Sequence, residues 1–255
     1  MPDPLVLLHG FTQTGASWDG VRAHLQSLDR PVITPDQRGH GTAADVRPIL
    51  LPAMAADAMA AATTSPSGNG QAALGATLAL GGYSMGGRAA LLAAQASPGR
   101  VTHLALISTT AGLDDEADRA ARAAADAALA DELESLDIEA LAQRWAAQPL
   151  FDGQSPEVAA AAHADRLRNT PAGLAASLRG AGTGKMGSLW AGLPSLTMPS
   201  LVLVGERDEK FRAIAERLAS GLPDAELVVV PGAGHAVPLE APRAVADALE
   251  ALLSR

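Results

Sequence analysis

A serine lies at the centre of a glycine-rich turn, Gly82-Tyr83-Ser84-Met85-Gly86-Gly87. The turn follows the apolar run Thr77–Leu80 and leads into a segment rich in alanine and leucine. A strand, a sharp turn and a helix in this order present a serine hydroxyl to open space, as in a nucleophile elbow. Gly82 and Gly86 leave room for a strained backbone that side chains would block. We therefore predict that Ser84 takes part in catalysis.

A serine hydroxyl is a poor nucleophile or base by itself, so it needs a histidine within hydrogen-bond reach to take its proton. His235 ends the loop Pro231-Gly232-Ala233-Gly234-His235, directly after an apolar run. The glycines would let this loop bring the imidazole over Ser84. His9 and His40 lie in glycine-containing turns that favour a structural role. We therefore predict that His235 is the partner of the serine.

An acidic residue would orient this histidine and stabilise its cationic form. Asp208 follows the apolar run Leu201–Val204 in the sequence Gly205-Glu206-Arg207-Asp208. Glu206 in the same loop is its rival. We predict that Asp208 is the acid, which gives the chain order Ser84, Asp208, His235.

Two backbone N–H groups are candidates for an oxyanion hole, which needs donors near the oxygen that becomes negative. The sequence His9-Gly10-Phe11 ends the first apolar run, so we expect Phe11 to supply one donor and Met85 the other. Arg88 lies in the first turn of the helix after Ser84, where the helix dipole disfavours a cation. Arg88 is either a clamp for a substrate carboxylate or an arginine that packs its stem and reaches solvent.

The elements that must position these residues follow from hydrophobic patterning. Six short apolar runs are typical of buried parallel strands. They are Leu5–Leu8, Pro31–Thr34, Thr77–Leu80, Leu104–Ile107, Leu201–Val204 and Leu227–Val230. Helical segments lie between most of them, including Met85–Ala96, Glu209–Ser220 and Pro242–Leu253. This alternation predicts an α/β sheet whose site lies at the carboxyl ends of the strands.

The middle of the chain breaks the alternation, because it is charged and helical in pattern with no clear strand. We predict a core at residues 1–112 and 193–255 and a helical cap at residues 113–192. Gly180–Gly187 contains four glycines and is expected to be a flexible connection. Ser65–Gly70 has the composition of a surface loop.

Composition restricts the function further. The formal net charge is −9 and no basic stripe is visible, which argues against nucleic acid as a partner. A small anionic substrate stays possible, because a local arginine cluster can override the global charge. The chain has no cysteine, so disulfides and thiolate metal sites are excluded. No signal-peptide or membrane-spanning pattern is visible, and we expect a cytoplasmic protein without a membrane partner.

Five stretches together resemble a known family. They are Leu8–Phe11, Gly82–Arg88, Trp145–Phe151, Leu167–Asn169 and Gly205–Ala213. The chain is similar to the 2-succinyl-6-hydroxy-2,4-cyclohexadiene-1-carboxylate synthases of menaquinone biosynthesis, which are α/β-hydrolases, and the likeness runs nearly end to end. The Gly205–Ala213 stretch is more specific than the elbow.

The resemblance implies an α/β-hydrolase fold, with a mostly parallel sheet flanked by helices and an inserted helical cap. It also implies a lyase that eliminates pyruvate from 2-succinyl-5-enolpyruvyl-6-hydroxy-3-cyclohexene-1-carboxylate. The serine–histidine pair would remove a ring proton, and the oxyanion hole would hold the charge that develops on the succinyl carbonyl. No metal and no organic cofactor would be needed.

The resemblance also implies substrate-binding residues. Arg88, Arg122 and Arg168 would clamp the substrate carboxylates, and Tyr83 and Trp145 would line the pocket. Planar guanidinium groups suit the recognition of paired carboxylate oxygens.

Some features depart from the family pattern, and one of them allows two alignments of the chain with the family. Arg119 lies three residues before Arg122, so the match could be displaced by one helical turn. The turn Asp36–Gly41 contains Gln37-Arg38 where the family commonly has Leu-Pro, and Ala236 follows the histidine where asparagine is frequent. A carboxylic-ester or carbon–carbon bond hydrolase that forms an acyl-enzyme is therefore the alternative, and a non-catalytic binding protein is a third hypothesis.

Overall fold

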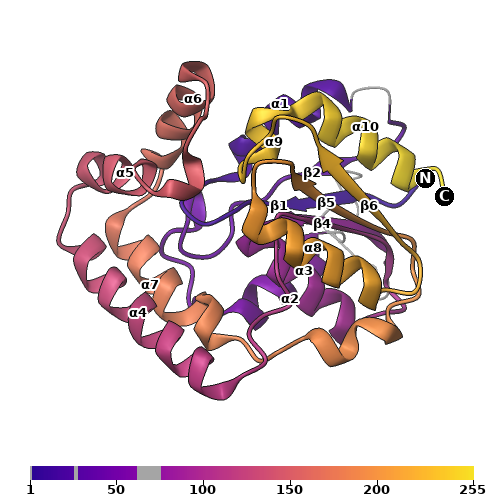
Figure 1. The fold of residues 1–255 in the computed structure, drawn as a ribbon, viewed down its shortest axis with the longest axis horizontal. Helices are drawn as coiled ribbons and strands as arrows, with labels where there is room; N and C mark the ends of the chain where they lie inside the picture. The colour runs from indigo at the N-terminus through magenta and orange to yellow at the C-terminus, as the bar shows by residue number, and fades with distance from the viewer. Residues whose placement is uncertain (1, 26–27, 62–75) are drawn as a thin grey trace, which may run out of the picture.

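The structure is a computed structural model that describes residues 2–25, 28–61 and 76–255. The surface loop expected at residues 65–70 lies outside the described residues. The strands form one sheet in the order β2-β1-β3-β4-β5-β6, and every neighbouring pair is parallel. Figure 1 shows this sheet with helices on both of its faces and a group of helices to one side. This is the parallel sheet flanked by helices that the sequence predicted.

Each apolar run of the sequence forms a strand. The strands are β1 (Leu5–Leu8), β2 (Val32–Ile33), β3 (Leu78–Tyr83), β4 (Val101–Ile107), β5 (Ser200–Gly205) and β6 (Ala225–Val230). The third strand extends beyond the predicted end at Leu80, because Gly81 and Gly82 still pair with β1. The strand therefore delivers Tyr83 directly to the elbow.

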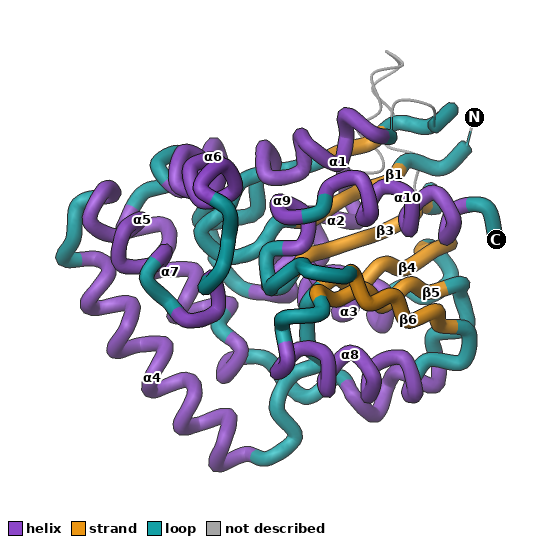
Figure 2. The backbone as a smooth tube through the Cα atoms, turned by 45° about the horizontal axis from the view of Figure 1, so that its top comes forward, coloured by secondary structure: helices purple, strands orange, loops and turns teal. Residues whose placement is uncertain are grey.

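Helices cover the two faces of the sheet in two layers (Figure 2). One layer contains α2 (Leu51–Ala61), α3 (Met85–Ala96) and α8 (Glu209–Gly221), and the other contains α1 (Asp19–His24) and α10 (Pro242–Leu253). The short helix α9 (Val237–Glu240) precedes α10. In β1 the side chains of Val6 and Leu8 face the first layer, whereas Leu5 and Leu7 face the second. This period of two, with apolar residues on both faces, is typical of a buried parallel strand.

Four α-helices lie between β4 and β5 in the sequence, and they gather to one side of the sheet (Figure 1). They are α4 (Glu116–Glu134), α5 (Ile138–Ala146), α6 (Pro156–Arg166) and α7 (Pro171–Ala181). Each begins after a residue whose side chain accepts a hydrogen bond from a backbone N–H of the first turn. These residues are Asp115, Asp137, Ser155 and Thr170. We call α4–α7 the inserted helices and propose that they form the cap expected at residues 113–192.

The glycines of Gly180–Gly187 permit close packing, which differs from the expected flexible connection. A Cβ atom on Gly180 would lie 1.9 Å from the carbonyl oxygen of Ile49, and one on Gly184 would lie 2.3 Å from the backbone nitrogen of Ala123. Of the four glycines in this stretch, only Gly187 has open space around the position of a Cβ atom. The absence of side chains lets α7 and the turn after it approach neighbouring backbone.

No helix within the described ranges is long and apolar enough to span a bilayer. The expected cytoplasmic location stays a prediction.

Candidate active site

Ser84 lies at the turn between β3 and α3, with φ 52° and ψ −110°. This conformation is strained for a residue with a side chain. The predicted need for flanking glycines is confirmed: a Cβ on Gly82 would lie 2.2 Å from the Gly86 oxygen, and one on Gly86 would lie 2.2 Å from the Leu8 oxygen. The hydroxyl of Thr109 donates to the Ser84 carbonyl oxygen at 2.7 Å. The elbow is therefore held by backbone contacts on both sides and by one side chain.

The structure brings Ser84, Asp208 and His235 together at the carboxyl ends of three strands. Nδ1 of His235 lies 2.6 Å from Oδ2 of Asp208, and Nε2 lies 3.3 Å from Oγ of Ser84. An ionised carboxylate can only accept a hydrogen bond, so Nδ1 carries the proton and Nε2 is free to accept one from the serine hydroxyl. The arrangement can remove a proton from the serine or, through it, from a bound molecule.

The alternative acid, Glu206, and the alternative histidines, His9 and His40, have other surroundings. Glu206 is exposed, and its carboxylate accepts a hydrogen bond from the backbone N–H of Gly232 at 2.8 Å. His9 is buried, and its Nε2 accepts from the backbone N–H of Gln37 at 2.9 Å. Burial lowers the pKa of His9 to about 4 and that of His40 to about 3. Both rings are therefore neutral and belong to the protein interior, as their glycine turns indicated.

A cavity of about 370 Å³ opens beside Ser84 and His235. Of the residues predicted for substrate contact or the oxyanion hole, five line it: Phe11, Met85, Arg88, Arg122 and Trp145. Met85 is the first residue of α3, so its N–H has no carbonyl partner one turn earlier in the helix. Phe11 and Met85 both line the cavity, and their roles as oxyanion-hole donors stay predictions.

Positive charge dominates the cavity lining. Arg88, Arg122 and Lys210 line it, and none of the described lining residues is Asp or Glu. The chain as a whole carries a formal net charge of −9, so this concentration of cations is local. A low-dielectric cleft lined by one sign of charge attracts ligands of the opposite sign.

Arg88 is buried against the cavity, with 7% of its surface exposed. Its Nη1 donates to the carbonyl oxygen of Ala181 at 2.7 Å. Burial, followed by the neighbouring Arg122 cation, lowers the pKa of Arg88 to about 10, so it remains cationic at neutral pH. Of the two interpretations from the sequence, the arginine that reaches solvent is excluded.

The α4 arginines are distinguished by their partners. Arg122 lines the cavity, and its Nε donates to Oδ1 of Asp126 at 2.8 Å. Arg119 instead donates to the carbonyl oxygens of Leu113 and Asp114 and is not among the described residues of the lining. Of these two arginines, only Arg122 is therefore placed to reach a ligand in the cavity.

Trp145 packs edge-on against Phe11, with ring centroids 4.8 Å apart. Its indole Nε1 is buried and has no hydrogen-bond partner among the described residues. A buried donor without a partner is costly, and a ligand acceptor in the cavity would relieve that cost.

Tyr83 does not line the cavity, contrary to the prediction. It is the last residue of β3, and the alternation of the strand directs its side chain to the face covered by α1 and α10. Its ring packs against His235, with centroids 5.3 Å apart. Tyr83 thus supports the histidine from within the core.

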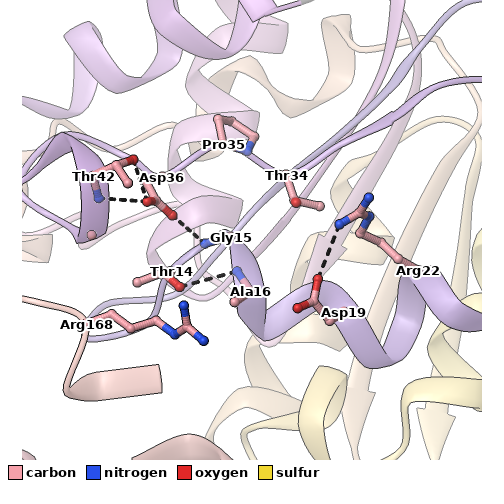
Figure 3. A pocket seen from close by; sticks show the side chains of 11 residues that line it. Thr14, Gly15, Ala16, Asp19, Arg22, Thr34, Pro35, Asp36, Thr42 and Arg168 are labelled. Atoms are coloured by element: carbon pink, nitrogen blue, oxygen red, sulfur yellow. Dashed lines mark hydrogen bonds and ion pairs between the residues drawn. The ribbon is translucent and has the colours of Figure 1, made fainter. Parts of the chain in front are cut away.

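Arg168 also differs from the prediction. Its side chain is 63% exposed and lies 3.7 Å from Oδ1 of Asp165. Figure 3 shows it at a separate surface pocket of about 630 Å³, which also contains Asp36 and Arg22. This pocket contains none of the predicted catalytic residues. Arg168 is therefore not a ligand of the Ser84 cavity.

The sequence patterns did not single out Arg166 or Lys210, and of these two described residues only Lys210 lines the cavity. Arg166 is 2% exposed, and its guanidinium lies 5.1 Å from the centroid of the Phe151 ring. Arg166 is the last residue of α6 and turns inward, whereas Arg168 lies in the turn after the helix and is exposed. Lys210 lies within the Gly205–Ala213 stretch that carried the resemblance, which was the available signal.

The described residues contain no group of three His, Asp or Glu side chains placed to hold a metal ion.

Comparisons with known proteins agree on one family. The alpha/beta hydrolase family profile matches residues 5–248. The chain is 33% identical over 249 residues to the 2-succinyl-6-hydroxy-2,4-cyclohexadiene-1-carboxylate synthase of Enterobacter sp. (strain 638), which covers 98% of this chain and 91% of that relative. A relative from Bacillus subtilis (strain 168), which bears the same synthase name provisionally, is 42% identical over 165 residues. That match covers 64% of this chain and 60% of the relative.

A solved structure extends the likeness to three dimensions. The structure of MenH from S. aureus superposes with a TM-score of 0.86 and 29% identity, covering 99% of this chain and 93% of that chain. These matches confirm the family resemblance that the sequence predicted.

Proposed function

This chain belongs to the alpha/beta hydrolase family, and from that membership we propose that it is a lyase of menaquinone biosynthesis. The proposed reaction eliminates pyruvate from 2-succinyl-5-enolpyruvyl-6-hydroxy-3-cyclohexene-1-carboxylate. Relatives that carry the name of the product's synthase support the assignment, several of them along nearly the whole chain.

The proposed reaction begins with proton abstraction. His235 takes the proton of the Ser84 hydroxyl, and the serine oxygen removes the ring proton next to the succinyl carbonyl. The electron pair of that C–H bond forms a new ring double bond, the existing double bond shifts by one position, and the bond between the ring and the enolpyruvyl oxygen breaks. The leaving enolate takes up a proton and becomes pyruvate, so atoms and electrons balance without an oxidant or an acyl-enzyme.

Each group of the site has a role in this scheme. Asp208 holds the tautomer of His235 that can accept the serine proton and stabilises the imidazolium that forms. The backbone N–H groups of Phe11 and Met85 would stabilise the negative charge on the succinyl carbonyl oxygen. The unpartnered Nε1 of Trp145 is a further donor for a substrate oxygen.

The observation that carries the proposal is the charge of the cavity lining. Arg88, Arg122 and Lys210 face the same cavity as Ser84, with no Asp or Glu among the described lining residues. The proposed substrate carries several carboxylates, whereas a simple short-chain ester carries none. Guanidinium groups bind carboxylates with paired, charge-assisted hydrogen bonds.

The test is an assay of pyruvate release from the proposed substrate. The wild-type protein is expected to release pyruvate, and Ser84→Ala is expected to reduce release to the background rate while keeping the far-UV circular dichroism spectrum. The alternative, an ester or carbon–carbon bond hydrolase that forms an acyl-enzyme, has the same three side chains available. No release of pyruvate together with rapid cleavage of a short-chain ester would establish that alternative. Binding of the substrate without turnover would instead support a non-catalytic binding protein.

A further inference from the structure

We propose that Glu240 is a positioning residue that holds the loop carrying His235 in register with Ser84. The proposal rests on the role given to His235 above. Glu240 is the last residue of α9, five residues after the histidine. It does not line the cavity, so any effect on the reaction must pass through another residue.

The carboxylate of Glu240 accepts hydrogen bonds from the residues on both sides of His235. The backbone N–H of Gly234 donates to Oε2 at 2.7 Å, and the backbone N–H of Ala236 donates to Oε1 at 3.1 Å. These two bonds hold the backbone one residue before and one residue after the histidine. The imidazole can then turn only about its own side-chain torsions.

Burial makes these contacts strong and their loss costly. The side chain of Glu240 is 7% exposed. A buried carboxylate must be paired with donors or a cation, because leaving it unpaired carries a large desolvation cost. Nη2 of Arg207 supplies the cation at 2.9 Å from Oε2.

Arg207 connects Glu240 to the segment between the inserted helices α5 and α6. Its Nη1 donates to the carbonyl oxygen of Gly153 at 3.0 Å, and its Nε donates to that of Gly232 at 2.8 Å. Arg207 directly precedes Asp208 in the sequence. Its contacts therefore connect the loops that carry Asp208 and His235 to the segment between α5 and α6.

A purely structural explanation is that Glu240 caps the short helix α9. Such a cap would stabilise the fold without affecting the alignment of His235 with Ser84. Glu206 provides a matched control, since its carboxylate accepts from the N–H of Gly232 in the same loop but three residues from the histidine. The two carboxylates should differ in their effect on the reactivity of Ser84, whereas a cap predicts only a difference in stability.

The experiment measures how fast a neutral fluorophosphonate labels Ser84 in folded wild-type, Glu240→Gln and Glu206→Gln protein. Labelling needs the serine–histidine alignment but not the proposed substrate. In Glu240→Gln the amide nitrogen would face one of the two backbone N–H groups, and because two donors cannot bond to each other the loop would shift. The labelling rate should then fall by about 10- to 100-fold. For pyruvate release, kcat should fall by a similar factor with little change in KM, while Glu206→Gln should label at close to the wild-type rate.

A wild-type labelling rate in folded Glu240→Gln, or an equal loss in both variants, would overturn the proposal. If Glu240→Gln does not fold, Glu240→Asp takes its place, because a carboxylate one methylene shorter cannot reach both N–H groups. Glu240→Asp should then label more slowly than wild type, and a wild-type rate would overturn the proposal. Wild-type protein that is not labelled at Ser84 would overturn both the role of the serine and this inference. Labelling without pyruvate release would refute only the proposed lyase activity.

Discussion

Oδ2 of Asp208 lies 2.6 Å from Nδ1 of His235, and each of the two side chains is only 3% exposed. A contact this short and this well shielded from water fixes both the orientation and the tautomer of the imidazole. The serine hydroxyl, 3.3 Å from Nε2 on the other side of the ring, is therefore aligned with a proton acceptor before any ligand binds. The proposed base is prepared by the fold itself.

Asp208→Asn should separate this alignment from simple packing. The amide can donate to Nδ1, which favours the tautomer whose Nε2 carries a proton and cannot accept one from Ser84. We expect kcat for pyruvate release to fall by about 10³- to 10⁴-fold, with a KM close to that of wild type. Glu206→Gln removes the rival carboxylate and serves as the control, and equal losses in both variants would contradict the assignment of Asp208.

Arg88→Met should weaken the binding of anions more than the chemistry of the serine. The methionine retains most of the buried volume but loses the charge and the hydrogen bonds to a substrate carboxylate. We expect kcat/KM for the proposed substrate to fall by the equivalent of roughly 1.5–3 kcal/mol. Labelling of Ser84 by a neutral fluorophosphonate should change little. A parallel loss in both measurements would mean that Arg88 supports the elbow structurally, through its bond to Ala181.

Arg122 and Arg168 should respond differently to the same substitution. Arg122 lines the Ser84 cavity, whereas Arg168 lies at the separate surface pocket in Figure 3. Arg122→Met should lower kcat/KM for the anionic substrate by about tenfold, which corresponds to one charge-assisted hydrogen bond. Arg168→Met should leave steady-state kinetics unchanged, and a large loss in that variant would restore Arg168 to the substrate site.

Acid should destabilise the protein through its buried histidines. The pKa values of His9, about 4, and His40, about 3, lie below the value of 6.5 for an exposed histidine. Below pH 6.5 the unfolded chain therefore binds protons that the folded chain does not. The free energy of unfolding should fall from pH 6.5 towards pH 4 by up to about 1.4 kcal/mol per pH unit for each histidine.

Urea unfolding at a series of pH values would measure this dependence. His40→Gln removes one of the titrating groups and should reduce the slope in the same window. An unchanged slope in that variant would contradict the contribution of His40.

Gly180→Ala should destabilise the protein although alanine favours a helix more than glycine does. The new Cβ would lie 1.9 Å from the carbonyl oxygen of Ile49, so α7 would have to move away from the core. We expect the free energy of unfolding to fall by about 1–3 kcal/mol, as for other overpacked sites. Gly187→Ala is the matched control, because nothing lies within 4 Å of the added atom. The midpoints of thermal unfolding of the two variants test this expectation. Equal midpoints would contradict close packing at Gly180.

The sequence alone was sufficient to predict the α/β fold and the chain order of Ser84, Asp208 and His235. Apolar runs of the right length become strands, and parallel strands place their carboxyl ends at one edge of a sheet. Ser84, Asp208 and His235 each follow such a run, so their approach to one another follows from topology without any knowledge of side-chain packing. The capping residues and the elbow glycines are likewise local signals that the chain carries in itself.

Only the tertiary structure decided which way the remaining side chains point. Tyr83 turns into the core, Arg166 at the end of α6 turns inward, and Arg168 in the turn after α6 turns to the surface. The direction of a side chain depends on long-range packing and on the element or turn in which the residue lies, and local sequence patterns do not specify either. For the same reason the bonds of Glu240 to the residues beside His235 could be found only once the backbone of that loop was known.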